Sequence, residues 1–170
     1  MKQLLVKIDE NNGETYFEGF SCEVLQRGQL ASLEQAFIEI GKEKAEKIIF
    51  DSIKKFTIQT VQKYNMFLIS FARFRRKDIA EMLLKQLPER GFGVAKIIEW
   101  NEVTRRVTIE VKNSFESHNR KSERPVCIAL SAIFAGAFEI LFNKQCTIAE
   151  VQCTAMGGKT CLFEMVGEKD

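Results

Sequence analysis

One segment near the C-terminal end constrains the fold more than any other part of the chain. It reads PVCIALSAIFAGAFEILF and covers residues 125–142. The segment is apolar on nearly every side of a helix, and Pro125 suits the first helical turn, so a buried helix is predicted. Several small residues would let another backbone approach it closely, namely Ser131, Ala132, Ala135, Gly136 and Ala137.

Two helical patterns precede this segment. From about Gln29 to Tyr64 apolar residues recur at helical spacing, with the charged stretch GKEKAEK between them. This pattern predicts one long helix, or two helices with a break near Gly41. A second pattern covers Met66–Leu87, is interrupted around RFRRKD, and stops at Pro88 and ERGFG.

Alternating patterns lie on either side of the buried segment. FGVAKIIEW and RRVTIEVKN flank NEVT and predict two antiparallel strands, while QCTIAEVQCTA and TCLFEMV predict two more around MGGK. Residues 3–8 alternate weakly and predict a short strand. The predicted fold class is α+β, with long N-terminal helices packed with an antiparallel sheet, a buried helix and a C-terminal hairpin. Without repeats or low-complexity tracts, residues 1–170 are expected to form a single domain.

The overall charge and the ends of the chain restrict the function classes. A net charge of +2 predicts no general attraction to nucleic acid or membranes, and no apolar run is long enough for membrane insertion. The first nine residues are too short and too charged for a signal peptide, so a cytoplasmic location is expected. In that reducing compartment the five cysteines are expected to be thiols or metal ligands: Cys22, Cys127, Cys146, Cys153 and Cys161.

Several short motifs resemble functional sites without meeting their requirements. GGKT would need a glycine where Cys153 stands, and a strand follows it instead of a helix, so it is not a phosphate-binding loop. GFG has Lys96 in place of the third glycine of a dinucleotide fingerprint. The basic stretch RFRRKD is typical of a solvated helix face, although it could contact an anionic group. His118 has no predicted nucleophile beside it.

Three cysteines are the candidates for metal binding. If the last turn centres on Gly157, Cys153 and Cys161 lie opposite each other on one face of the hairpin, close enough to share an ion. Cys127 opens the buried helix, where the positive helix end favours the thiolate. Thiolates suit zinc, but small buried core residues are the alternative interpretation.

A fourth ligand would come from Cys146, Glu150 or His118. On an unbroken strand Glu150 and Cys153 point to opposite faces, because their separation is odd. The same objection applies to Cys146. Glu150 therefore qualifies only if a bulge or twist intervenes.

The sequence resembles the 4-vinyl reductase domain family, particularly the sensor domains of aromatic-responsive bacterial transcription activators. The residues that carry this resemblance are Pro125-Val126-Cys127, ALSAIFAGAFEILF and AEVQCTAMGGKTCLFEM, within residues 115–166. The family fold is related to subunits of the transport protein particle, a vesicle-trafficking complex. The resemblance implies a zinc site formed by Cys127, Glu150, Cys153 and Cys161, and hence a distorted strand before Cys153.

The resemblance also implies a pocket for hydrophobic small molecules beside the hairpin and a homodimer formed through the long helices. The function favoured is therefore binding of a hydrophobic or aromatic ligand by a domain stabilised with a structural zinc. Aromatic residues offered as pocket candidates are Phe67, Phe71, Phe74, Trp100 and Phe134.

Two alternatives remain at this point. The family name suggests a reductase acting on a vinyl-bearing or tetrapyrrole-type substrate. The chain has no flavin, nicotinamide or iron–sulfur signature, which favours a protein without enzymatic activity. The other alternative is a protein-interaction module that binds no ligand, and the sequence does not separate it from the ligand-binding domain.

Overall fold

The computed structural model describes residues 6–9, 14–17, 20–22, 27–69 and 75–166. A small antiparallel sheet comes first, formed by β1 (Val6–Asp9), β2 (Glu14–Phe17) and β3 (Phe20–Cys22). β1 overlaps the short strand predicted at residues 3–8, whereas β2 and β3 were not predicted. Short strands of this kind escape detection because they hold too few residues to show a clear alternation.

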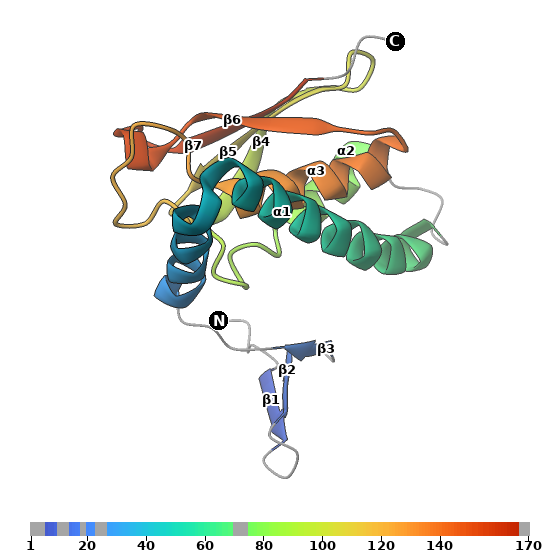
Figure 1. Ribbon diagram of the computed structural model, residues 1–170. Helices are drawn as coiled ribbons and strands as arrows, with labels where there is room; N and C mark the ends of the chain where they lie inside the picture. The colour runs from blue at the N-terminus through green and yellow to red at the C-terminus, as the bar shows by residue number, and fades with distance from the viewer. Residues whose placement is uncertain (1–5, 10–13, 18–19, 23–26, 70–74, 167–170) are drawn as a thin grey trace.

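The main sheet has four antiparallel strands in the order β4-β5-β7-β6. The helices lie on one side of it, with α3 between the sheet and α1 (Figure 1). This arrangement confirms the predicted α+β class. The elements of this body are α1 (Arg27–Ile69), α2 (Arg76–Leu84), β4 (Val94–Asn101), β5 (Arg106–Lys112), α3 (Ile128–Phe142), β6 (Thr147–Gln152), the short 3-10 helix η1 (Thr154–Met156) and β7 (Cys161–Val166).

The buried helix α3 forms the centre of the core, as predicted. Gly136 lets α1 pack closely against it, because a Cβ at this position would lie 2.8 Å from the carbonyl oxygen of Lys54. The helix begins at Ile128 and not at Pro125, since Cys127 is its N-cap with a non-helical backbone. Pro125 therefore precedes the helix, which corrects the prediction that it stands in the first turn.

The boundary between the first two helices also differs from the prediction. α1 breaks at Gly41, where the backbone leaves helical geometry, and this confirms the predicted break. Residues 66–69 belong to the end of α1, not to the start of the next helix. No helix among the described residues is both long and apolar enough to cross a bilayer.

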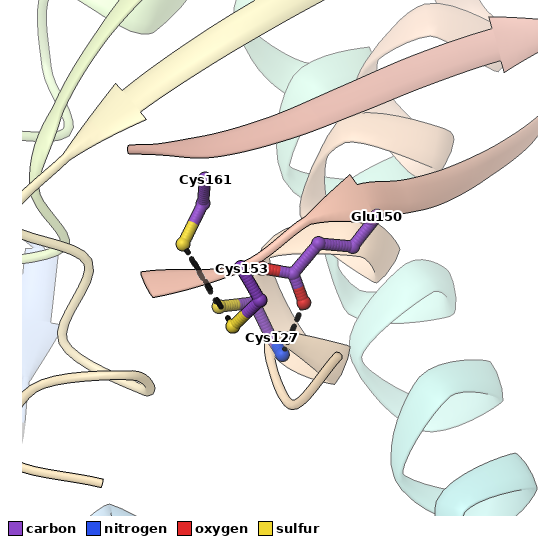
Figure 2. Close-up of side chains that lie close together, drawn as sticks. All are labelled: Cys127, Glu150, Cys153 and Cys161. Carbon is purple, nitrogen blue, oxygen red and sulfur yellow. Dashed lines mark hydrogen bonds between the residues drawn. The ribbon is translucent and has the colours of Figure 1, made fainter. Parts of the chain in front are cut away.

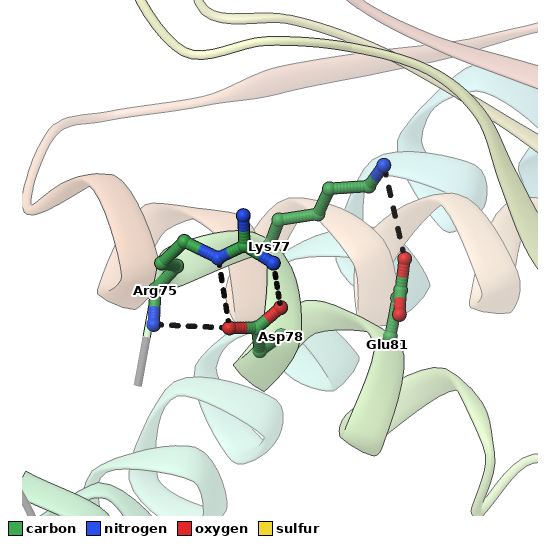
Figure 3. A network of polar contacts seen from close by, with 4 residues as sticks. All are labelled: Arg75, Lys77, Asp78 and Glu81. Carbon is green, nitrogen blue, oxygen red and sulfur yellow. Dashed lines mark hydrogen bonds and ion pairs between the residues drawn. The ribbon is translucent and has the colours of Figure 1, made fainter. Parts of the chain in front are cut away.

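The basic stretch at the start of α2 is compensated by neighbouring carboxylates. Asp78 accepts hydrogen bonds from the backbone and the guanidinium of Arg75, and Lys77 lies 3.9 Å from Glu81 (Figure 3). Arg76 pairs with a glutamate of the β4–β5 turn at 2.8 Å. These contacts agree with a solvated helix face.

Candidate metal centre

Four side chains from three parts of the fold meet where the last hairpin reaches the start of α3. They are Cys127, Glu150, Cys153 and Cys161, which we call the cysteine–glutamate cluster (Figure 2). One possible ligand atom from each residue lies within 4.8 Å of all the others. The three cysteines are buried, and Glu150 is half-buried.

The sulfur atoms stand at the spacing that a tetrahedral zinc site requires. The Sγ atom of Cys161 lies 3.8 Å from that of Cys127 and 4.0 Å from that of Cys153. Zinc–sulfur bonds of about 2.3 Å in a tetrahedron place two sulfurs about 3.8 Å apart. The cluster is therefore preorganised for a tetrahedrally coordinated ion.

A bulge in β6 brings Glu150 to the side of the cysteines. Glu150 pairs with Phe163 of β7, but Gln152 pairs with Leu162, which leaves Val151 as an extra residue on β6. Such a bulge reverses the alternation of side chains that follows it. The predicted strand distortion before Cys153 is confirmed.

Two glycines allow the chain to return from β6 to β7. Gly157 has a positive φ of 90°, which glycine adopts without strain. At Gly158 a Cβ would lie 2.9 Å from the carbonyl oxygen of Cys153, so only glycine fits without a shift. The turn leads into β7, which confirms that GGKT is not a phosphate-binding loop.

The carboxylate of Glu150 has one satisfied and one unsatisfied oxygen. Its Oε2 accepts a hydrogen bond from the backbone N–H of Cys127 at 2.8 Å, whereas its Oε1 is buried without a hydrogen-bond partner. Burial raises the pKa of Glu150 to about 9. A cation between this oxygen and the sulfurs would satisfy it, and a set of three thiols and a carboxylate fits zinc.

Hydrogen bonds among the thiols distribute their charge unevenly. The hydrogen bond with Cys127 lowers the pKa of Cys153 to about 6 and that of Cys161 to about 4. Cys127 has a raised pKa, because its thiol interacts with both of these sulfurs and is itself buried. The expectation that the helix start makes Cys127 a thiolate is therefore wrong for the thiols as they stand.

The sequence reasoning missed Glu116, which is fully buried beside the cluster. Its carboxylate accepts hydrogen bonds from the backbone N–H groups of Ala129 at 2.7 Å and Leu130 at 2.9 Å. It thus caps α3 from a loop that is distant in sequence, and so stabilises the helix start that carries Cys127. No local spacing could reveal this role, because capping patterns join residues only three apart.

Three hydroxyl side chains surround the sulfurs. Ser114 Oγ lies 3.3 Å from the Sγ atom of Cys127, and Ser117 Oγ lies 3.5 Å from that of Cys161. Thr154 donates its backbone N–H to Cys161 at 3.4 Å and its hydroxyl to Ser117 at 2.5 Å. Such contacts orient metal ligands and moderate the charge of thiolates.

The other candidate ligands lie outside the cluster. Cys146 is buried, and its thiol contacts the carbonyl oxygen of Lys144 at 3.2 Å. His118 is exposed. Of the three alternatives for the fourth position, the structure brings Glu150 to the three cysteines.

The predicted pocket residues have different surroundings. Trp100 is half-buried and stacks on Phe142 at a centroid distance of 5.4 Å, with Phe138 at 6.1 Å. Phe134 packs edge-on against Phe163 in the core, at 5.0 Å. Phe71, Phe74 and the side chain of Phe67 lie outside the described residues. A pocket role for these five residues stays a prediction.

The sequence comparisons agree with the resemblance noted from the motifs. Residues 107–166 match the model of the 4-vinyl reductase domain. An uncharacterised protein of Methanocaldococcus jannaschii is 25% identical over 83 residues, which cover 49% of this chain and 44% of that protein. The match thus spans less than half of the relative's length.

Three solved structures share the fold. The phenol-responsive sensory domain of the transcription activator PoxR, with phenol, has a TM-score of 0.79 at 14% identity, covering 95% of this chain and 84% of that one. A vinyl-4-reductase family protein of M. jannaschii has a TM-score of 0.61 at 19% identity, with coverages of 88% and 85%. A trafficking protein particle complex subunit 3 of Naegleria fowleri, covalently bound to palmitic acid, has a TM-score of 0.55 at 11% identity, with coverages of 84% and 95%. The resemblance to this family and fold is confirmed.

Proposed function

We propose that the chain is a small-molecule sensor domain stabilised by one structural zinc ion, held by Cys127, Glu150, Cys153 and Cys161. The observation that carries the zinc proposal is the buried oxygen of Glu150, which has no hydrogen-bond partner and faces correctly spaced sulfurs. Zinc would supply the positive charge that buried thiolates need. Four protein ligands fill a tetrahedral shell, which assigns the ion a structural role.

The proposed ligand is a hydrophobic or aromatic molecule, and its site lies beside Trp100. The fold shared with the PoxR domain, whose structure contains phenol, supports this ligand class. Trp100 presents an aromatic surface together with Phe138 and Phe142. Apolar residues of α2 and β4 near it, including Ile79 and Ile97, are only partly buried against the core. A preformed site of this kind favours apolar ligands.

The proposed assembly is a homodimer formed through α1. Four large apolar side chains of this helix are more than half exposed: Leu33, Phe37, Ile48 and Phe56. An apolar surface of this kind on one element is typical of protein–protein contacts. We also place the chain in the cytoplasm, where cysteine ligands stay reduced.

A thermal-shift screen of the zinc-loaded protein tests the ligand proposal. A panel of phenols, other aromatics and fatty acids should contain ligands that raise the melting temperature in a concentration-dependent manner. Trp100→Ala should reduce that shift, and Val103→Ala, a substitution at a residue that is 93% exposed, should leave it unchanged. A folded, zinc-loaded protein that responds to no compound would contradict the sensor and favour the interaction module.

A further inference from the structure

We propose that the face of the main sheet opposite α3 carries a second binding site, for a small organic molecule that bears a phosphate group. A hollow of about 1130 Å³ lies there, between β5, β7 and the loop of residues 113–120. Glu110 and Lys112 line it, while the alternate residues Ile109 and Val111 point into the core. This hollow is therefore separate from the aromatic site proposed beside Trp100.

The hollow concentrates positive charge in a chain that is nearly neutral overall. Its basic side chains are Lys112, Arg120 and Lys159, and its acidic one is Glu110. The carboxylate of Glu110 is already neutralised by Lys96 at 2.8 Å, a residue outside the lining. The net charge offered to a ligand is therefore positive, as an anion requires.

Neutral donors complete the polar part of the lining. The hydroxyls of Ser117 and Thr154 and the amides of Asn113 and Asn119 face the same hollow. Ser117 and Thr154 are held in place by hydrogen bonds to each other and to the sulfur of Cys161. A phosphate group accepts many hydrogen bonds and suits such a set of cations and fixed donors.

An apolar wall indicates that the ligand is larger than a phosphate ion. Ile98, which is half exposed, and Leu162 line the hollow together with the polar residues. A ring or short chain attached to the phosphate would cover them, because burial of exposed apolar surface favours binding. The volume of about 1130 Å³ accommodates a molecule of this size.

The test uses the full, zinc-loaded chain and calorimetric titration with two probes, inorganic phosphate and phenyl phosphate. Both should bind saturably, phenyl phosphate more tightly. The variant Lys112→Gln/Lys159→Gln should weaken both at least tenfold. Lys77→Gln/Lys85→Gln on α2 and its C-cap removes the same charge elsewhere and should leave both affinities unchanged. Ile98→Ser should weaken phenyl phosphate alone.

The outcomes separate this site from the proposed sensor function. Absence of saturable binding by both probes would overturn the inference, as would equal weakening in the two lysine variants. Displacement of phenyl phosphate by phenol would also overturn it, because it would place the probe in the aromatic site. Zinc content and folding are measured on the same samples. A zinc-loaded, folded protein that fails only the phosphate titration overturns this inference and leaves the proposed function intact.

Discussion

At the residue scale, Cys161 has more contacts within the cysteine–glutamate cluster than its partners. It contacts the sulfurs of Cys127 and Cys153 and accepts the backbone N–H of Thr154. Cys161→Ser should therefore abolish stoichiometric zinc binding and lower the melting temperature, because zinc binding and folding are coupled. Metal analysis and calorimetry measure both effects.

Cys146 provides the matched control for this substitution. It is buried like Cys161, but it lies outside the cluster, and its thiol contacts the carbonyl oxygen of Lys144. Cys146→Ser should retain one zinc per chain. Loss of zinc in both variants to the same extent would contradict the assignment of the ligands.

Glu116 carries the second prediction at this scale. Gln at this position keeps the size but removes the negative charge that caps α3, and its amide would face a backbone N–H. We expect a loss of about 2 kcal/mol in the free energy of unfolding, typical of a buried hydrogen bond to a charged group. Urea unfolding measures it, with Glu123→Gln at an exposed position of the same loop as control. An unchanged midpoint in Glu116→Gln would refute the capping role.

At the element scale, the packing of α3 against α1 depends on Gly136. Alanine would gain about 1 kcal/mol of helix propensity but would place a methyl group 2.8 Å from the carbonyl oxygen of Lys54. Overpacking of this kind costs about 1–3 kcal/mol, so Gly136→Ala should lower stability. Chemical denaturation measures the change. The same substitution at Gly41, where no atom lies within 4 Å, should not lower it, and a more stable Gly136→Ala protein would show that the helices separate easily.

The elements that the sequence predicted are those with strong periodic patterns. The buried helix, the first hairpin and the break at Gly41 follow from apolar spacing and glycine position. The bulge near Glu150 was inferred only because the family resemblance required Glu150 beside Cys153. β2, β3 and the capping by Glu116 stayed hidden, since short strands and distant side-chain contacts leave no local pattern.

At the scale of the whole molecule, the exposed apolar side chains of α1 predict self-association. Phe37 and Phe56 are 54% and 68% exposed, and glutamate at both positions would place charges in the proposed interface. Light scattering should find a dimer for the wild-type protein and a monomer for Phe37→Glu/Phe56→Glu. Val103→Glu, at a residue that is 93% exposed on the β4–β5 turn, should remain dimeric. A wild-type monomer at concentrations on the order of tens of micromolar would contradict this assembly.

The most direct test of the account is X-ray absorption at the zinc edge, on protein purified with about one zinc per chain. The cysteine–glutamate cluster predicts three sulfur neighbours at about 2.3 Å and one oxygen at about 2.0–2.2 Å. Glu150→Gln should alter the oxygen contribution and leave the three sulfurs in place. A shell of four sulfurs, a shell dominated by oxygen and nitrogen, or a folded protein that binds no zinc would contradict the assigned metal centre.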